Sequence, residues 1–261
     1  MSGTDISVGI VSFRTDTETA AAVRSLEEHT DASLRKHIYV VDNAASIDGT
    51  SSALKALADS YADVTYHAAN TNLGYGRANN LVLPYLRSRY HVIMNPDVLL
   101  KEDSLRLLYD FMESNPSCVM AIPRLVGERG TILPVYRKDP TVLDLFARRF
   151  APHLLRKRTA SHGLSGSDFE KPFEVPFAQG SFLIVRTEDL KAERGFDDRF
   201  FMYMEDADLC RRMRKRGDLL YTPATTVMHS WRQGSKRNLR LFFIHVHSIW
   251  QYFEKWGFQW L

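Results

Sequence analysis

Apolar residues in the first half of the chain alternate between short continuous runs and longer stretches with helical spacing. The runs are typical of strands buried on both faces of a sheet, at residues 6–13, 38–41, 64–67 and 91–94. The stretches that follow predict helices, at residues 17–28, 49–60, 77–87 and 103–114. We expect Asp103 or Ser104 to cap the last of these helices. Strands separated by helices of this length indicate βαβ units and a mostly parallel central sheet.

The second half of the chain departs from this alternation. Residues 139–172 contain no clear strand pattern and many basic residues, so we interpret them as an insert that is mobile or faces a membrane. The later pattern predicts a strand, a helix, an edge strand and a final amphipathic helix, at residues 177–186, 205–216, 218–223 and 239–256.

The length of 261 residues fits one large domain. We divide it into a βαβ region at residues 1–125, a smaller region at residues 126–235 and the amphipathic helix at residues 236–261. The content of 44% hydrophobic and 25% charged residues is ordinary for a globular protein. A net charge of +3, without a recognition motif, does not favour binding to nucleic acid.

The two cysteines, Cys118 and Cys210, lie in apolar strand and helix patterns, so we expect buried free thiols, which suit a reducing compartment. The first five residues lack the basic and apolar regions of a signal peptide. No apolar run approaches the roughly 18 residues that span a bilayer. The sequence therefore indicates a cytoplasmic protein.

Polar residues follow three of the predicted strands, and we expect them to meet at one edge of the sheet. They are Ser12, Asp42, Asn43, Asn95 and Asp97. Open α/β sheets bind ligands outside the carboxyl ends of their strands, so this edge is the predicted ligand site.

Two features of this edge suit a nucleotide. The Asp42 carboxylate can accept from the N3–H of a pyrimidine, although an aspartate that caps a turn would have the same pattern. The sequence NLGYGR, from Asn72 to Arg77, can bring backbone N–H groups at Gly74 and the charge of Arg77 to a phosphate. An ordinary strand-to-helix turn is an equal alternative, and the glycine spacing is not the dinucleotide-binding one.

Asp97 is a candidate metal ligand, because Pro96 ends the strand before it and directs the carboxylate out of the sheet. A divalent cation that binds a nucleotide diphosphate needs only one or two protein carboxylates. The alternative is a simple turn aspartate. His229 is ordinarily a structural histidine, but it becomes a second candidate ligand because Asp97 alone leaves such a cation under-coordinated.

Glu205 and Asp206 open a predicted helix directly after the apolar run FFMYM at residues 200–204. Acids in the first turn complement the helix dipole, which is the structural explanation. Their place beside an apolar wall instead favours a general base whose pKa is shaped by burial.

Together these motifs resemble the family 2 glycosyltransferases of the GT-A fold, over nearly the whole chain. The branch that is most similar transfers rhamnose to polyprenyl-diphosphate-linked N-acetylglucosamine in O-antigen or cell-wall assembly. The resemblance rests on VVDN at 40–43, NLGYGRANN at 72–80, MNPD at 94–97, QGSFLIVR at 179–186, GFD at 195–197 and FFMYMEDADLCRR at 200–212.

The resemblance implies a role for each motif. Asp42 would read the base, and Gly180 and Ser181 would line the donor-sugar pocket. Asp97 would be the last aspartate of the metal motif, in which Asn95 replaces the usual first acid. The cation, Mn²⁺ or Mg²⁺, would then depend on Asp97, the diphosphate and His229.

Catalysis is implied as well. Asp206 would deprotonate the acceptor hydroxyl, with Glu205 able to exchange roles, and the reaction would invert the anomeric centre. The implied donor is dTDP-L-rhamnose; a UDP-hexose donor and a non-catalytic nucleotide-sugar binding module are the alternatives.

Basic residues are interleaved with apolar ones near both ends of the second half. The first group is Leu145, Phe146, Arg148, Arg149, Phe150, Leu154, Leu155, Arg156, Lys157 and Arg158. The second is Lys236, Arg237, Arg240, Trp250, Tyr252, Phe253, Trp256, Phe258 and Trp260. This combination predicts a protein peripheral to the inner face of the cell membrane, close to a lipid-linked acceptor. Packing of the last helix on its own domain, or in a homodimer, is the alternative.

Overall fold

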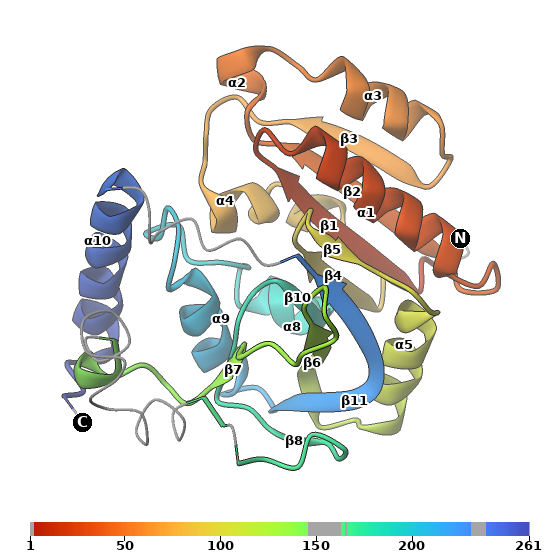
Figure 1. Cartoon of the computed structure of the whole chain (residues 1–261). Coiled ribbons are helices and arrows are strands. Elements are labelled where there is room, and N and C mark those ends of the chain that lie inside the picture. The colour runs from red at the N-terminus through yellow and green to blue at the C-terminus, as the bar shows by residue number, and fades with distance from the viewer. Residues whose placement is uncertain (1–2, 146–162, 165, 231–238, 261) are drawn as a thin grey trace.

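The computed structural model of the chain describes residues 3–145, 163–164, 166–230 and 239–260. A curled mixed sheet runs through its centre in the order β3-β2-β1-β4-β10-β6-β11-β5, and β8 also pairs with β11 (Figure 1). The first four of these strands are mutually parallel, as the apolar runs predicted. They are β1 (Ile6–Ser12), β2 (Lys36–Asp42), β3 (Val64–Ala68) and β4 (Tyr90–Met94).

The other half of the sheet is mixed. Its strands are β5 (Val98–Leu99), β6 (Cys118–Val126), β8 (Phe173–Glu174), β10 (Phe182–Arg186) and β11 (Asp218–His229). β10 enters between β4 and β6 and is antiparallel to both, whereas β11 is parallel to β6. A separate pair is formed by β7 (Tyr136–Arg137) and β9 (Phe177–Ala178). The expected α/β architecture is confirmed, with an antiparallel strand at its centre.

Helices join and flank these strands. They are α1 (Asp16–His29), α2 (Ala45–Asp48), α3 (Ser52–Asp59), α4 (Tyr75–Asn80), α5 (Ser104–Ser114), α8 (Thr187–Ala192), α9 (Glu205–Met213) and α10 (Leu239–Trp256). The Asp103 carboxylate accepts from the Arg106 N–H and so caps α5, as predicted. α10 stands at the left of Figure 1, beside α9.

Two helices differ from their predicted extents, each for a local reason. The helix predicted at 77–87 is α4 followed by a short 3₁₀ turn at Leu83–Tyr85, because Pro84 has no N–H to continue the α-helix. The helix predicted at 49–60 begins later than expected, as α3 at Ser52, because Gly49 has a φ of +81° and ends the short helix α2 that precedes it. The Ser51 hydroxyl then accepts from the Leu54 N–H and starts α3.

The strand predicted at residues 218–223 is present as part of β11 (Asp218–His229), but the prediction that it lies at the edge of the sheet is wrong. β11 continues to His229 and lies inside the sheet, with β6 on one side and β8 and β5 on the other. Pro223 is tolerated there because the register with β6 shifts between Thr222 and Thr226, so that the proline falls in an irregularity of the ladder.

The strand predicted at 177–186 is also divided, into β9 and β10, with a break at residues 179–181. Both cysteines are buried free thiols, as expected. Among the described helices none is both long and apolar enough to cross a membrane. Part of the predicted membrane-facing residues lies outside the described ones, namely Phe146, Arg148, Arg149, Phe150, Leu154, Leu155, Arg156, Lys157, Arg158, Lys236 and Arg237.

Candidate active site

The carboxyl ends of the parallel strands meet at one edge of the sheet, as the sequence predicted. Ser12 and Asp42 are direct neighbours in the register of β1 and β2. Met94 lies opposite Ile10, so Asn95 leaves β4 at the same level. The Ser12 hydroxyl is buried and lies 3.1 Å from the Thr15 hydroxyl.

Asp42 holds the turn that follows β2. One carboxylate oxygen accepts from the Ala44 N–H at 3.1 Å. The other accepts from the Ser51 N–H at 3.0 Å and from the Tyr66 hydroxyl at 2.8 Å. The Asp42 carboxylate therefore caps the turn, as the alternative interpretation predicted. Its first oxygen can still accept one further hydrogen bond.

Asn43 fixes the loop that precedes α4. Its amide nitrogen donates to the Asn72 side-chain oxygen and to the Gly74 carbonyl, both at 3.2 Å. Its amide oxygen accepts from the Leu73 N–H at 3.0 Å. Asn43 and Asn72, both predicted to bind the donor, thus brace the glycine-containing loop against the end of β2.

Gly74 brings this loop against the segment that precedes α9. Its φ is +77°, and a Cβ at this position would lie 1.9 Å from the carbonyl oxygen of Phe201. The next residue, Tyr75, donates its N–H to that same carbonyl at 3.0 Å. Only glycine meets both requirements, which explains the residue at this place in the sequence.

The break between β9 and β10 joins three parts of the site. The Tyr75 hydroxyl donates to the Gly180 carbonyl at 2.7 Å, and the Gly180 N–H donates to the Asp206 carboxylate at 3.2 Å. The Asn95 N–H donates to the Ser181 carbonyl at 2.8 Å. The loop before α4, the end of β4 and the start of α9 therefore converge on residues 179–181. The Ser181 hydroxyl is buried and has no hydrogen-bond partner in the described part of the chain.

Glu205 and Asp206 open α9 beside this junction. Glu205 is only 5% exposed, and one of its carboxylate oxygens has no hydrogen-bond partner among the described residues. Burial, and then the charge of Asp206, raises the pKa of Glu205 well above its ordinary value. Burial also raises the pKa of Asp206, against the hydrogen bond from the Gly180 N–H, which lowers it. The pair can therefore hold a proton that an isolated carboxylate would lose.

Asp97 and His229 meet because β5 begins directly after Asp97 and pairs with the last two residues of β11. An oxygen of the Asp97 carboxylate lies 3.2 Å from Nε2 of His229. The imidazole is buried, and its Nδ1 has no hydrogen-bond partner within the described ranges. These residues come from positions 132 apart in the sequence (229 − 97), and the sheet places them side by side.

Two neighbours of the site were not predicted as functional residues. Tyr75 lies within electrostatic reach of Glu205, Asp206 and Asp97, and burial followed by these charges raises the pKa of its hydroxyl. Its position between Gly74 and Gly76, in the loop predicted to bind phosphate, could have identified Tyr75 from the sequence. Asp208 is fully buried and binds α10 rather than facing the junction.

Arg77, predicted to bind phosphate, is exposed and lies against the loop before α9. Its Nε donates to the Asp198 carbonyl at 2.6 Å. A phosphate contact from its remaining N–H groups stays a prediction.

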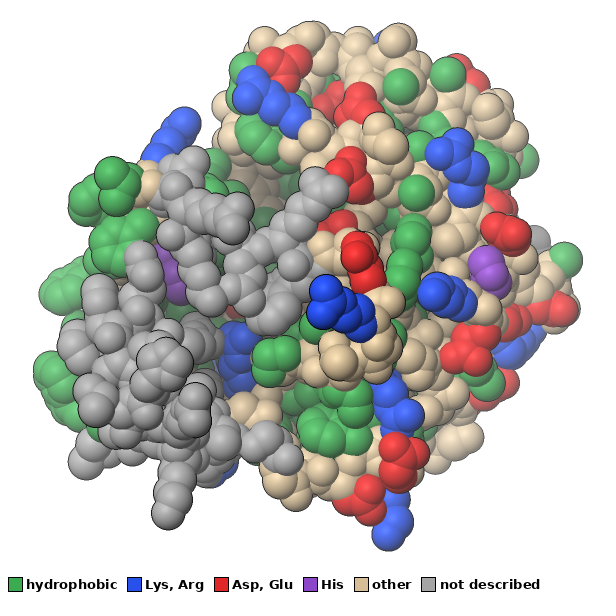
Figure 2. Space-filling model, in the orientation of Figure 1, with side chains coloured by type: hydrophobic (Ala, Val, Ile, Leu, Met, Phe, Trp, Pro, Cys, Tyr) green, Lys and Arg blue, Asp and Glu red, His purple; other side chains and the backbone are tan. Residues whose placement is uncertain are grey.

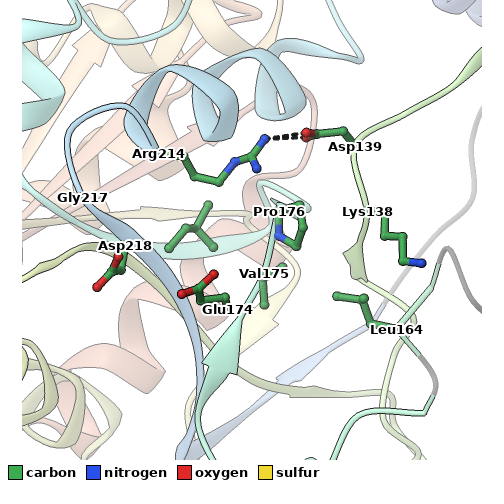
Figure 3. A pocket seen from close by; sticks show the side chains of 10 residues that line it. Lys138, Asp139, Leu164, Glu174, Val175, Pro176, Arg214, Gly217 and Asp218 are labelled. Carbon is green, nitrogen blue, oxygen red and sulfur yellow. Dashed lines mark hydrogen bonds and ion pairs between the residues drawn. The ribbon is translucent and has the colours of Figure 1, made fainter. Parts of the chain in front are cut away.

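A cavity of about 650 Å³ lies beyond the C-terminal end of α9. Figure 3 shows Arg214 in it, paired with Asp139 at 2.6 Å, together with Glu174 and Asp218. None of the predicted site residues lines this cavity, so we do not assign the ligand site to it. In the described residues there is no group of three or more histidine, cysteine, aspartate or glutamate side chains that could hold a metal ion by themselves.

Two known proteins that are similar to this chain in sequence are both rhamnosyltransferases. The chain is 27% identical over 200 residues to the rhamnosyltransferase WbbL of Escherichia coli K12, covering 74% of this chain and 72% of that protein. It is 30% identical over 207 residues to the N-acetylglucosaminyl-diphospho-decaprenol L-rhamnosyltransferase of Mycobacterium tuberculosis, covering 74% of this chain and 66% of that one. The chain therefore spans about two thirds of the length of the mycobacterial relative.

Among solved structures, the mannosyltransferase PcManGT of Pyrobaculum calidifontis, in complex with GDP-Man and Mn²⁺, is similar with a TM-score of 0.63. The sequence identity is 16%, and the match covers 96% of this chain and 63% of that one, so this likeness concerns the GT-A fold. The model of the family described as glycosyl transferase family 2 matches residues 7–194, a range that contains the whole strand-end site up to Ser181. The chain therefore belongs to glycosyl transferase family 2.

Proposed function

We propose that this protein transfers a sugar from a nucleotide-sugar donor to an acceptor hydroxyl, with inversion at the anomeric carbon. The observation that carries this proposal is the pair of the buried Glu205 and the partly buried Asp206, whose carboxylate accepts from the Gly180 N–H at the same junction as Asn95. Such a pair offers a base beside the edge of the sheet where α/β proteins bind nucleotides.

The two carboxyl groups have different roles in this proposal. Burial and the neighbouring charge favour the neutral form of Glu205, which leaves Asp206 as the carboxylate of the pair. Asp206 takes the proton of the acceptor hydroxyl as that oxygen attacks the anomeric carbon. The bond from this carbon to the diphosphate oxygen breaks, and its electron pair leaves with the nucleoside diphosphate.

Asp97 and His229 would hold a divalent cation, which neutralises charge on the leaving diphosphate when it is bound. Their atoms fit this role, since 3.2 Å is close to the roughly 3 Å between adjacent ligands of an octahedral ion with bonds of about 2.1 Å. The carboxylate suits either Mn²⁺ or Mg²⁺ with phosphate and water as further ligands, and the imidazole nitrogen favours Mn²⁺ of the two. Nδ1 of His229 is buried and has no hydrogen-bond partner among the described residues, so the described contacts leave open the tautomer in which Nε2 carries the lone pair that would bind the metal.

For the donor we propose dTDP-L-rhamnose, and for the acceptor a sugar linked to a polyprenyl diphosphate. The names of the two relatives support rhamnose as the transferred sugar, and the name of the mycobacterial relative supports an acceptor linked to a polyprenyl diphosphate. Asp42 would accept from the N3–H of the thymine through its remaining acceptor position, and Gly180 and Ser181 would face the sugar.

A donor screen that measures release of nucleoside diphosphate tests the substrate. We expect turnover with dTDP-rhamnose and a loss of turnover when divalent cations are chelated. Turnover with a UDP-hexose but none with dTDP-rhamnose would reject the rhamnosyl donor, and turnover that is indifferent to chelation would reject the metal site.

Substitution of the base separates an enzyme from a non-catalytic binding module. We expect Asp206→Asn to lower kcat by at least about a hundredfold while the donor still binds, because the amide cannot accept the proton. The exposed Asp198→Asn in the preceding loop is the matched control and should keep full turnover. A fully active Asp206→Asn variant would exclude the catalytic assignment.

The outer face of α10 supports a position at a membrane surface. Four large apolar residues on it are exposed, namely Leu239, Phe243, Val246 and Trp250. Their spacing places them along one side of the helix, bordered by Arg240. Figure 2 shows hydrophobic side chains gathered at the left edge of the molecule, where Figure 1 places α10. An anionic bilayer matches this combination, and a lipid-linked acceptor would be presented there.

A further inference from the structure

The turn that carries the carboxylate pair has an unusual backbone. Tyr203 and Met204, directly before Glu205, both adopt positive φ, at +71° and +67°. Left-handed conformations are unfavourable for residues with a Cβ, so two in succession persist only where surrounding contacts hold them. These contacts determine where α9 begins, and therefore where Asp206 points.

The inner face of α10 supplies contacts to this turn. The Ser248 hydroxyl donates to the Met202 carbonyl at 2.8 Å. One turn earlier on the same face, the ring of His245 lies 4.6 Å from the ring of Tyr203. Ser248 is 1% exposed, although its helix carries an exposed apolar row on its other side. The turn is thus held from the side of α10, while Tyr75 binds the Phe201 carbonyl from the side of the sheet.

The end of α10 holds the same segment at two further points. The Lys255 ammonium lies 2.7 Å from the Asp197 carboxylate and 2.5 Å from that of Asp208. The Trp256 indole N–H donates to the Asp208 carboxylate at 2.9 Å. The Arg211 guanidinium lies 4.5 Å from the centre of the Trp256 ring. Asp197 precedes the strained turn and Asp208 follows it, so Lys255 links the two ends of the segment.

From this arrangement we propose that α10 is a positioning element for the catalytic pair, in which Ser248 and Lys255 hold the left-handed turn so that Asp206 reaches the Gly180 N–H. This proposal rests on the proposed function for its effect on turnover. Ser248 and Lys255 touch neither substrate nor the reacting atoms in it. They act through the backbone at residues 202–204 and through Asp197 and Asp208.

Kinetics of Ser248→Ala and Lys255→Met test the proposal, with the exposed Glu254→Gln on the same helix as the control. We expect both variants to lower kcat by about tenfold, since a displaced base loses rate steeply, while the donor dissociation constant stays unchanged. Ser248→Thr and Lys255→Arg should restore most of kcat, because they keep the hydroxyl and the charge. The control should match the wild-type protein.

The pH dependence of kcat/KM is a second test, because a substitution that only destabilised the fold would not shift it. Loss of the Gly180 N–H bond removes an interaction that lowers the pKa of Asp206. The acidic limb of kcat/KM should therefore move to higher pH in Ser248→Ala, which changes no charge. Glu205 and Arg137, the charged groups that act on Asp206, are the same in this variant and in the wild-type protein.

Amide hydrogen exchange keeps this test separate from the proposed function. Even if the wild-type protein turns over no donor, Ser248→Ala should exchange faster at residues 202–206 than Glu254→Gln does. Unchanged exchange, or unchanged kcat and pH profile in an active enzyme, overturns the proposal. A parallel fall of kcat, donor binding and melting temperature also overturns it, because that result indicates general destabilisation.

Discussion

Gly74 and Gly180 serve the site through different physical constraints. Gly74 combines a left-handed backbone with a carbonyl oxygen in the place of a Cβ. Gly180 has an ordinary backbone, and a Cβ there would lie 3.2 Å from the Cβ of Asp206. The first glycine is needed to bring two loops together, and the second allows the base to approach the backbone N–H.

Gly74→Ala should destabilise the protein by about 2–4 kcal/mol, because the clash with Phe201 adds to the cost of a positive φ. Gly130→Ala is the matched control, since Gly130 has a φ of +75° with nothing within 4 Å of its Cβ position. It should cost only about 1 kcal/mol. Equal losses for the two variants in urea unfolding would show that the contact with Phe201 contributes nothing.

Gly180→Ala should instead affect turnover more than stability. The added methyl group presses on Asp206, so kcat should fall by about ten- to a hundredfold with a small change in the free energy of unfolding. Gly127→Ala, where the nearest contact is a flexible leucine methyl at 3.4 Å, should leave kcat unchanged. Steady-state kinetics with thermal melting checks both variants.

At the scale of elements, α10 has two faces with different partners. Its inner face buries Ser248, Tyr252 and Phe253 against the rest of the protein. Its outer face exposes the apolar row that includes Phe243 and Trp250, which are 67% and 57% exposed. Packing on its own domain and contact with a membrane are therefore compatible, because each uses a different side of the helix.

Phe243→Ser with Trp250→Ser should weaken binding to vesicles of anionic phospholipid by at least about tenfold, since burial of such a side chain contributes about 1.5–3 kcal/mol. Ile47→Ser removes an apolar residue that is similarly exposed, at 53%, on α2, and should not change binding. Co-sedimentation with vesicles measures the effect. The outer face of α10 does not bind lipid if the wild-type protein stays in the supernatant. The same conclusion follows if the double variant binds vesicles as well as the wild-type protein.

At the scale of the whole molecule, Lys255 connects the last helix to the centre of the chain through Asp197. Burial alone would raise the pKa of Asp197, but hydrogen bonds from Lys255 and Arg199 outweigh it and bring the pKa from 3.8 to about 2. Because the folded protein lowers this pKa, the ionised form contributes stability above about pH 4. That contribution is lost as the pH falls towards 2.

Lys255→Met should therefore lower the free energy of unfolding at pH 6, and the difference from the wild-type protein should shrink between about pH 4 and pH 2. Chemical denaturation at several pH values measures this. Lys191→Met, whose ammonium lies 3.6 Å from the exposed Glu188, is the control and should show little acid dependence. A difference for Lys255→Met that stays constant between about pH 4 and pH 2 would contradict the assignment to Asp197, because the contacts of Lys255 with Asp208 and Trp256 would then account for all of it.

The strand ends could be predicted from the sequence because they depend on local patterns. A buried run followed by a polar residue identifies Asp42 and Asp97, and the parallel sheet brings their strand ends to one edge. The glycine at position 74 was predicted with its loop, but its reason, the carbonyl of Phe201, lies 127 residues away (201 − 74). The raised pKa values of Glu205 and Asp206 likewise depend on burial in the folded protein, and the helical pattern in the sequence does not specify that burial.

What the sequence by itself determined is the α/β fold, the parallel half of the sheet and the residues at its carboxyl edge. Hydrophobic periodicity and turn chemistry act over a few residues, so they are readable along the chain. Only the tertiary structure decided the antiparallel entry of β10, the interior place of β11 and the meeting of Asp97 with His229. These depend on which strands pair across long separations, and a local pattern carries no information about the partner.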